Sequence, residues 1–80
     1  MTFERILHTG DNRRLSVSFT QVHAPSDKFF VELHDAEGRR ANFEMVRDER
    51  VGWRIARPAP DWVFPLEAKL AEEINGRKAP

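Results

Sequence analysis

Residues 29–45 read FFVELHDAEGRRANFEM, and this stretch decides the fold. Apolar side chains occupy every second position on either side of a short turn, which is typical of two strands that each bury one face. Within the turn, Gly38 suits the left-handed position of a three-residue hairpin loop between Asp35 and Arg39. The pairs that face each other are then Leu33–Ala41, Val31–Phe43 and Phe29–Met45. Each pair is apolar on both sides, so the turn and the pattern predict the same register.

The alternation continues on both sides of this hairpin. Apolar residues stand at positions 15, 17 and 19 before it and at positions 51, 53 and 55 after it. A first strand, over about residues 3–8, is less regular because Phe3, Ile6 and Leu7 do not share one parity. Turn residues at 10–12 and at 24–27 separate these segments. Short links between neighbouring strands predict antiparallel pairing in a meander.

The period of the pattern changes after the last strand. Pro58 and Pro60 break the sheet and favour an extended crossing segment. Apolar residues then follow at three- and four-residue spacing, which is one stripe of a helix: Val63, Leu66, Leu70 and Ile74. Pro65 suits the first turn of that helix, and Asn75-Gly76 is a stop signal.

The sheet has one apolar face and the helix has one apolar stripe, and each is the only candidate to cover the other. The sequence therefore predicts a two-layer α+β domain, in which an antiparallel β-meander of four to five strands carries one C-terminal helix packed on one face. The 80 residues form a single domain, with about residues 76–80 as a flexible tail. The expected core contains Phe19, Val31, Phe43, Trp53, Leu66, Leu70 and Ile74.

Composition removes several classes of function. The chain has no cysteine, which excludes disulfides, thiolate metal sites and a cysteine nucleophile. Thirteen basic residues balance thirteen acidic ones, so net charge gives no argument for nucleic acid or an anionic membrane. The early charges at Glu4 and Arg5 argue against a signal peptide, and no apolar run is long enough to span a bilayer. We expect a cytoplasmic protein.

The residues that usually carry chemistry do not converge. His8 and His34 share one end of the meander but are separated by a strand, and His23 lies at the other end, so we expect no metal site. A Ser–His–Glu arrangement can be drawn on the polar sheet face from Ser16 or Ser18, His34, and Glu32 or Glu44. The same residues are also usual on a solvated sheet face, and a thin domain offers little depth for shifting their pKa values. We expect no catalytic residues, and with no glycine-rich phosphate loop we expect no cofactor.

Two surfaces remain as candidates for binding. Phe30 and Val46 are apolar residues on the otherwise polar face, which favours a non-enzymatic module that binds a protein partner or itself. Scattered exposed apolar residues are also normal on proteins that bind nothing there.

The second candidate surface follows from topology. The turns after the first, third and fifth strands of a meander lie at one end of the sheet, and we call this end the arginine rim. Its members are Arg13, Arg14, Arg39, Arg40 and Arg57. One interpretation is an electropositive edge that binds an anionic ligand or a nucleic-acid backbone. The other is mutual neutralisation, since Asp11, Asp35, Glu37 and Asp61 are expected on the same rim.

Overall fold

The structure is a computed structural model that describes residues 2–9, 13–23, 27–50 and 52–78, with the backbone alone for Arg77 and Lys78. Its elements follow one another as β1 (Thr2–His8), β2 (Arg14–Val22), β3 (Lys28–Asp35), β4 (Arg40–Asp48), β5 (Gly52–Ala56), the 3-10 helix η1 (Asp61–Leu66) and α1 (Glu67–Lys78). The predicted turn residues 10–12 and 24–26, the strand residue Val51 and the tail residues Ala79 and Pro80 lie outside the described residues.

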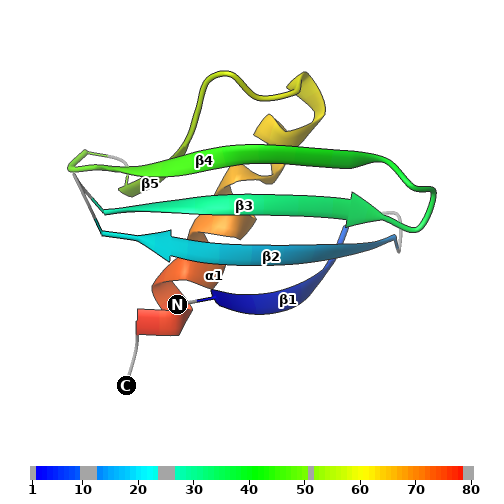
Figure 1. The fold of residues 1–80 in the computed structure, drawn as a ribbon, viewed down its shortest axis with the longest axis horizontal. Helices are drawn as coiled ribbons and strands as arrows, with labels where there is room; N and C mark the ends of the chain where they lie inside the picture. Colours follow the sequence, from blue (N-terminus) through cyan, green and yellow to red (C-terminus); the bar gives the residue numbers. More distant parts are fainter. Residues whose placement is uncertain (1, 10–12, 24–26, 51, 79–80) are drawn as a thin grey trace.

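Within the described residues, the five strands form one antiparallel sheet in the order β1-β2-β3-β4-β5 (Figure 1). This confirms the predicted meander and its α+β class. The central hairpin has the predicted register, with Leu33 opposite Ala41, Val31 opposite Phe43 and Phe29 opposite Met45. Alternation therefore sends odd-numbered residues of the strands towards the helix and even-numbered ones to the other side, which we call the outer face.

Left-handed glycines shape the two hairpins at β4. Gly38 has a φ of 88°, as the three-residue loop requires. Gly52 has a φ of 85°, although the sequence pattern placed it within a strand. It opens β5 directly opposite Asp48, whose carboxylate oxygen accepts a hydrogen bond from the Arg50 backbone N–H at 2.8 Å. The first residue of β5 therefore has a left-handed backbone conformation, next to the turn.

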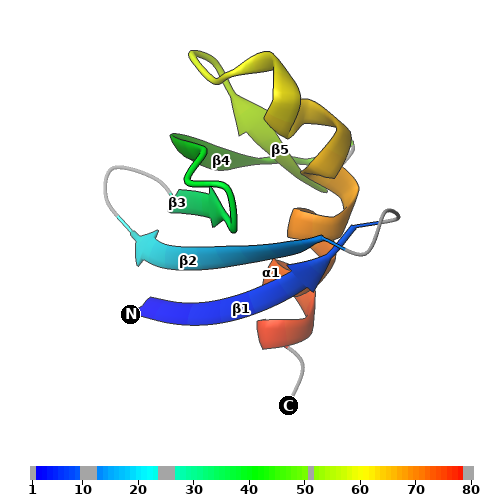
Figure 2. The same cartoon turned by 90° about the vertical axis from the view of Figure 1, so that its right-hand side faces the viewer.

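The helical layer lies behind the sheet in Figure 1, and α1 crosses the strands from β5 towards β1. In both views the last turn of α1 lies beyond β1 (Figures 1 and 2). Pro65 stands inside η1, and α1 proper begins two residues after it. The expected stop at Asn75-Gly76 is wrong, because α1 continues through both residues to Lys78.

The core fills the space between these two layers. Its largest fully buried side chains include Phe19, Phe29, Met45, Leu70 and Ile74. Of the predicted core residues only Leu66 is half-buried, and it packs against the others. Trp53 is buried and meets Phe29 edge to face, with 5.1 Å between the ring centroids. The prediction that Trp53 belongs to the core is therefore confirmed.

The two edges of the sheet are treated differently. At the β5 edge, the Glu67 carboxylate at the start of α1 accepts a hydrogen bond from the Ile55 backbone N–H at 2.9 Å. At the β1 edge, Arg5 stands at a core-facing position and reaches Glu73 of α1, with 3.2 Å between its Nε and the carboxylate. Arg5 explains the irregular pattern of β1, because it replaces an apolar residue between the buried Phe3 and Leu7. No helix among the described residues is long and apolar enough to cross a membrane.

Candidate functional site

The arginine rim is divided into two parts by the parity of the strands. On the side towards the helix, Arg13 pairs with Glu37 at 3.4 Å and Arg39 pairs with Asp35 at 3.2 Å. The Arg39 guanidinium also lies over the Trp62 ring, 4.0 Å from its centroid. Trp62 is half-buried and packs against the core, and a cation over an aromatic ring is a favourable contact.

Asp35 is the centre of this neutralised half. Burial alone would raise the pKa of its carboxyl. Two hydrogen bonds from the backbone N–H groups of Arg39 and Glu37, at 2.8 and 3.0 Å, favour the carboxylate, and so does the Arg39 guanidinium. Together they outweigh the effect of burial and lower the pKa of Asp35 below its ordinary value. Asp35 is thus held as a carboxylate that organises the loop. Arg13 and Arg39 thus each lie in an ion pair with an acidic residue of the same rim.

The other half of the rim lies on the outer face. Arg14 is opposite His8 in the ladder, and Arg40 is opposite His34. All four side chains are exposed. Among the residues that the structure describes, neither Arg14 nor Arg40 forms an ion pair. We call these four residues the basic patch.

Arg57 does not join either half of the rim. β5 has five residues and β4 has nine, so Ala56 is opposite Glu44, well before the end of β4 is reached. Arg40 stands four positions from Glu44 along β4, which is about 13 Å along the strand. Arg57 instead lies over the Phe64 ring of η1, 4.8 Å from its centroid. Alternate turns of a meander lie at one end of the sheet only when the strands have similar lengths. β5 is too short to bring Arg57 to the end where the other four arginines lie.

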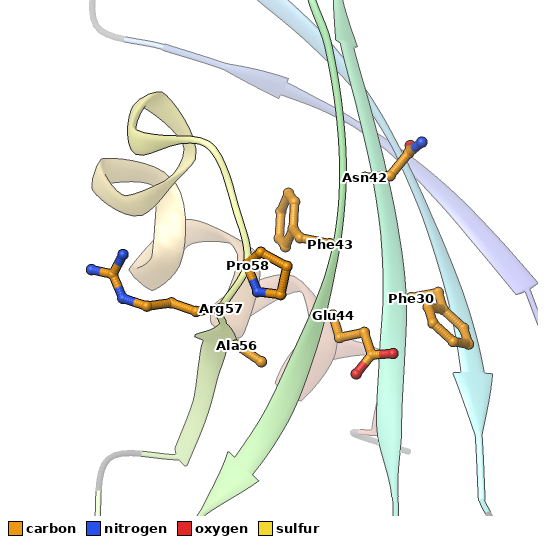
Figure 3. Close-up of a pocket in the computed structure, with 7 residues that line it drawn as sticks. All are labelled: Phe30, Asn42, Phe43, Glu44, Ala56, Arg57 and Pro58. Atoms are coloured by element: carbon orange, nitrogen blue, oxygen red, sulfur yellow. The ribbon is translucent and has the colours of Figure 1, made fainter.

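A groove of about 340 Å³ lies where β5 stops and β4 continues alone. Its lining consists of Phe30, Asn42, Phe43, Glu44, Ala56, Arg57 and Pro58. Phe30 and Asn42 project on one side of β4, and Phe43 and Pro58 lie on the other (Figure 3). The groove therefore wraps around the exposed part of the β4 edge.

Pro58 explains why the ladder stops there. The register that pairs Glu44 with Ala56 would next pair Asn42 with residue 58, and proline has no N–H to donate. Because Ile55 turns its N–H towards Glu67, the even residues of β4 are those that bond to β5. The backbone N–H and C=O of Asn42 consequently point into the groove, and no described residue bonds to them.

Phe30 and Val46 both lie on the outer face, but they belong to different surfaces. Phe30 is 43% exposed and lines the groove, with the Lys28 ammonium 5.3 Å from its ring centroid. Val46 is half-buried and lines a separate hollow with residues of the β4–β5 turn. Ile6, which the alternating pattern does not single out, is 57% exposed on the outer face of β1. Its parity could have indicated this once Phe3 and Leu7 were assigned to the core.

The chemistry-bearing residues stay apart in the described part of the chain, where no three His, Asp or Glu side chains gather as a metal ion would require. His23 contacts Asp27 at 3.1 Å, at the opposite end of the sheet from His8 and His34. Ser16 is directly opposite His34 in the ladder, but no hydrogen bond between their side chains is present in the described structure.

Comparison with known proteins adds no assignment, because no protein-family model, curated protein or solved structure matches the chain.

Proposed function

We propose that the protein is a non-enzymatic interaction module that binds an extended segment of a partner protein in the groove at the end of β5. The observation that carries this proposal is the exposed Phe30 beside an unpaired stretch of strand edge. The backbone groups of Asn42 offer one donor and one acceptor to a passing chain, which is how sheets recognise extended peptides. Phe30 offers an apolar surface for one side chain of that segment on the outer face, and Pro58 lines the groove on the other side of β4.

The charges around the groove narrow the description of the partner. Arg57 lies on the helix side of β4, whereas Glu44 lies on the outer face beside Lys28, with 3.4 Å between the carboxylate and the ammonium. A segment that places an apolar residue on Phe30 would therefore have the Arg57 guanidinium on one side and the Lys28–Glu44 ion pair on the other. Such a rim of polar groups around an apolar centre is typical of protein contacts.

A photo-reactive phenylalanine analogue in place of Phe30 tests this proposal. It preserves the aromatic ring, and irradiation in the cells that make the protein should yield one adduct of discrete mass. The same analogue in place of Glu72, which is exposed on α1, is the matched control and should yield none. The adduct should decrease in an Asn42→Pro background, because proline removes the donor that faces the groove. Equal adducts at both positions would contradict the proposal.

A second function has its own observation, which is that no residue in the described ranges forms an ion pair with Arg14 or Arg40 of the basic patch. We propose as the alternative that His8, Arg14, His34 and Arg40 bind an anionic ligand or a nucleic-acid backbone. Replacing Arg14 and Arg40 by glutamine should abolish binding of a short DNA or RNA duplex, and binding by the parent chain should weaken as salt increases. Glutamine at Arg47 and Arg50, exposed at the other end of the sheet, is the control. Binding that survives the first pair of changes removes this alternative.

Both proposals fit a cytoplasmic protein. A chain without cysteine is at no disadvantage in a reducing compartment. Fractionation of cells that express the protein at its native level would test the expected location.

A further inference from the structure

We infer that two copies of the chain pair through their β1 edges in antiparallel fashion, so that the two sheets become one continuous sheet across a twofold axis at Ile6. This inference is independent of the groove, which lies at the opposite edge of the sheet. It starts from the hydrogen bonds that β1 leaves unmade. A strand at the edge of a sheet presents a row of unpaired donors and acceptors, and natural proteins usually protect such a row.

The direction of these backbone groups follows from the ladder. The N–H of Thr9 donates to the C=O of Arg13 at 3.0 Å, one position beyond the β1–β2 pairs. Hydrogen-bonded pairs alternate in an antiparallel ladder, so the odd residues of β1 bond to β2. The even residues therefore direct their N–H and C=O groups away from the sheet, and these residues are Thr2, Glu4, Ile6 and His8.

The β5 edge shows what protection looks like in this molecule. β5 has only five residues, Glu67 bonds to the Ile55 N–H, and α1 packs against the strand. β1 has seven residues. The one protein contact to its outward backbone groups in the described structure is from Arg5, whose Nη1 donates to the Glu4 C=O at 2.9 Å. A carbonyl oxygen accepts two hydrogen bonds, so this contact leaves Glu4 able to pair.

The side chains of β1 complement a second copy of themselves. With the twofold axis at Ile6, the two Ile6 side chains face each other on the outer face. Ile6 is 57% exposed and is the most exposed large apolar residue in the described chain. In the same register Glu4 of each copy is opposite His8 of the other, so an acid meets a base twice. Cross-strand pairs of these kinds stabilise sheets.

The registers with an axis at Arg5 or at Glu4 are less favourable. An axis at Arg5 would place two arginines directly opposite each other, and an axis at Glu4 would do the same with two glutamates, and like charges in facing positions destabilise a sheet. Arg5 is a charged residue at a core-facing position of β1, and a charge at such a position disfavours the pairing of two edge strands in any register. Its guanidinium is held by Glu73 of α1 at 3.2 Å and lies over the Phe3 ring, 5.0 Å from the centroid, so it is directed to its own helix.

Cysteine crosslinking tests this register directly, because the chain has no cysteine of its own. In a hydrogen-bonded pair at the axis, the two Cα atoms at position 6 lie about 5.5 Å apart, which is within disulfide range. Ile6→Cys should therefore oxidise almost completely to a covalent dimer. Ser16→Cys is the matched control, because Ser16 neighbours Ile6 on β2 and the two copies of Ser16 would be three strand spacings, about 14 Å, apart. It should give only trace dimer.

A mixture of two further variants fixes the register. Glu4→Cys and His8→Cys should crosslink to each other but not to themselves, since residue 4 of one copy faces residue 8 of the other. Strong self-crosslinking of Glu4→Cys would overturn the Ile6 register.

Sedimentation over a wide range of concentrations gives a readout that needs no cysteine. The parent chain should show a species of twice its 9.3 kDa mass. Ile6→Lys should be monomeric with an unchanged circular dichroism spectrum, and Ser18→Lys, on the outer face of β2, should remain dimeric. A parent chain that stays monomeric at every concentration, or a dimer in which Ile6→Cys does not crosslink, would overturn the inference. If Ile6→Lys does not fold, the crosslinking pattern of Ile6→Cys and Ser16→Cys decides by itself.

Discussion

At the scale of single residues, Asp35 shows how a buried charge organises a loop. One carboxylate oxygen accepts hydrogen bonds from two backbone N–H groups, those of Glu37 and Arg39, and the other oxygen pairs with the Arg39 guanidinium. The backbone N–H groups of Glu37 and Arg39 donate to this carboxylate, so it stabilises the turn in its charged form.

The pH dependence of unfolding follows from that arrangement. The pKa of Asp35 is lower in the folded chain than its ordinary value. Its stabilising contribution is therefore complete above the ordinary carboxyl pKa of about 4, and it is lost as the pH falls through the folded-state pKa. We expect Asp35→Asn to lower the urea midpoint most at pH 7, with the difference from the parent chain shrinking below about pH 4. Glu49→Gln, at an exposed turn position, should change the midpoint little. A difference that is constant with pH would contradict this assignment.

Gly38 makes a second prediction at this scale. A Cβ atom at Gly38 would meet no other atom within 4 Å, so the cost of a side chain there comes from the positive φ alone. Gly38→Ala should reduce the free energy of unfolding by about 1–2 kcal/mol. Gly76→Ala is the matched control, because Gly76 lies in α1 with equally open surroundings, and it should raise stability by up to about 1 kcal/mol. Equal effects of the two changes in a denaturant titration would refute the backbone explanation.

These two residues were not equally predictable. The position of Gly38 followed from the sequence, because the loop length and the apolar pairs on both sides fix it together. The role of Asp35 did not, since its partners are backbone groups that converge only once the loop has closed. The positive φ of Gly52 was not predicted, because a glycine at a polar position of an alternating strand gives no sign of its backbone conformation.

At the scale of elements, the two edge strands differ in how their outward backbone groups are covered. Helix α1 starts beside β5, and Glu67 lies where its carboxylate reaches the Ile55 N–H. Its position two residues after Pro65 suits an acidic residue at a helix start, where a negative charge complements the helix dipole. That assignment contains no information about β5, because the contact depends on how the crossing segment turns back over the sheet.

The Glu67 contact predicts a graded series of variants. Glu67→Ala leaves the Ile55 N–H without its acceptor next to a buried side chain, and it should cost about 1–3 kcal/mol. Glu67→Gln keeps an acceptor oxygen at the same place and should cost clearly less. Glu72→Ala changes an exposed glutamate on the same helix and should be nearly neutral. Urea titrations of the three variants measure the order, and equal losses for Glu67→Ala and Glu72→Ala would exclude the edge contact.

At the scale of the whole molecule, the meander and its covering helix were predictable because alternation, turn residues and the later helical stripe all indicated one arrangement. The distribution of the arginines was predictable only in part. Topology brought Arg13, Arg14, Arg39 and Arg40 to one end, but parity then separated the paired from the unpaired ones. Arg57 lies elsewhere because β5 ends early, at Ala56, two residues before Pro58. That early end creates the groove, which no local pattern in the sequence indicates.

The most direct test of the central claim is a cysteine footprint of the groove. Asn42→Cys places a thiol on the exposed groove wall, and Glu72→Cys places one on the exposed side of α1. With purified protein both thiols should react rapidly with a maleimide. In an extract of the cells that make the protein, at its native concentration, Asn42→Cys should react several-fold more slowly while Glu72→Cys should be unchanged. If Asn42→Cys reacts equally fast in both, the groove is not the surface that the partner covers.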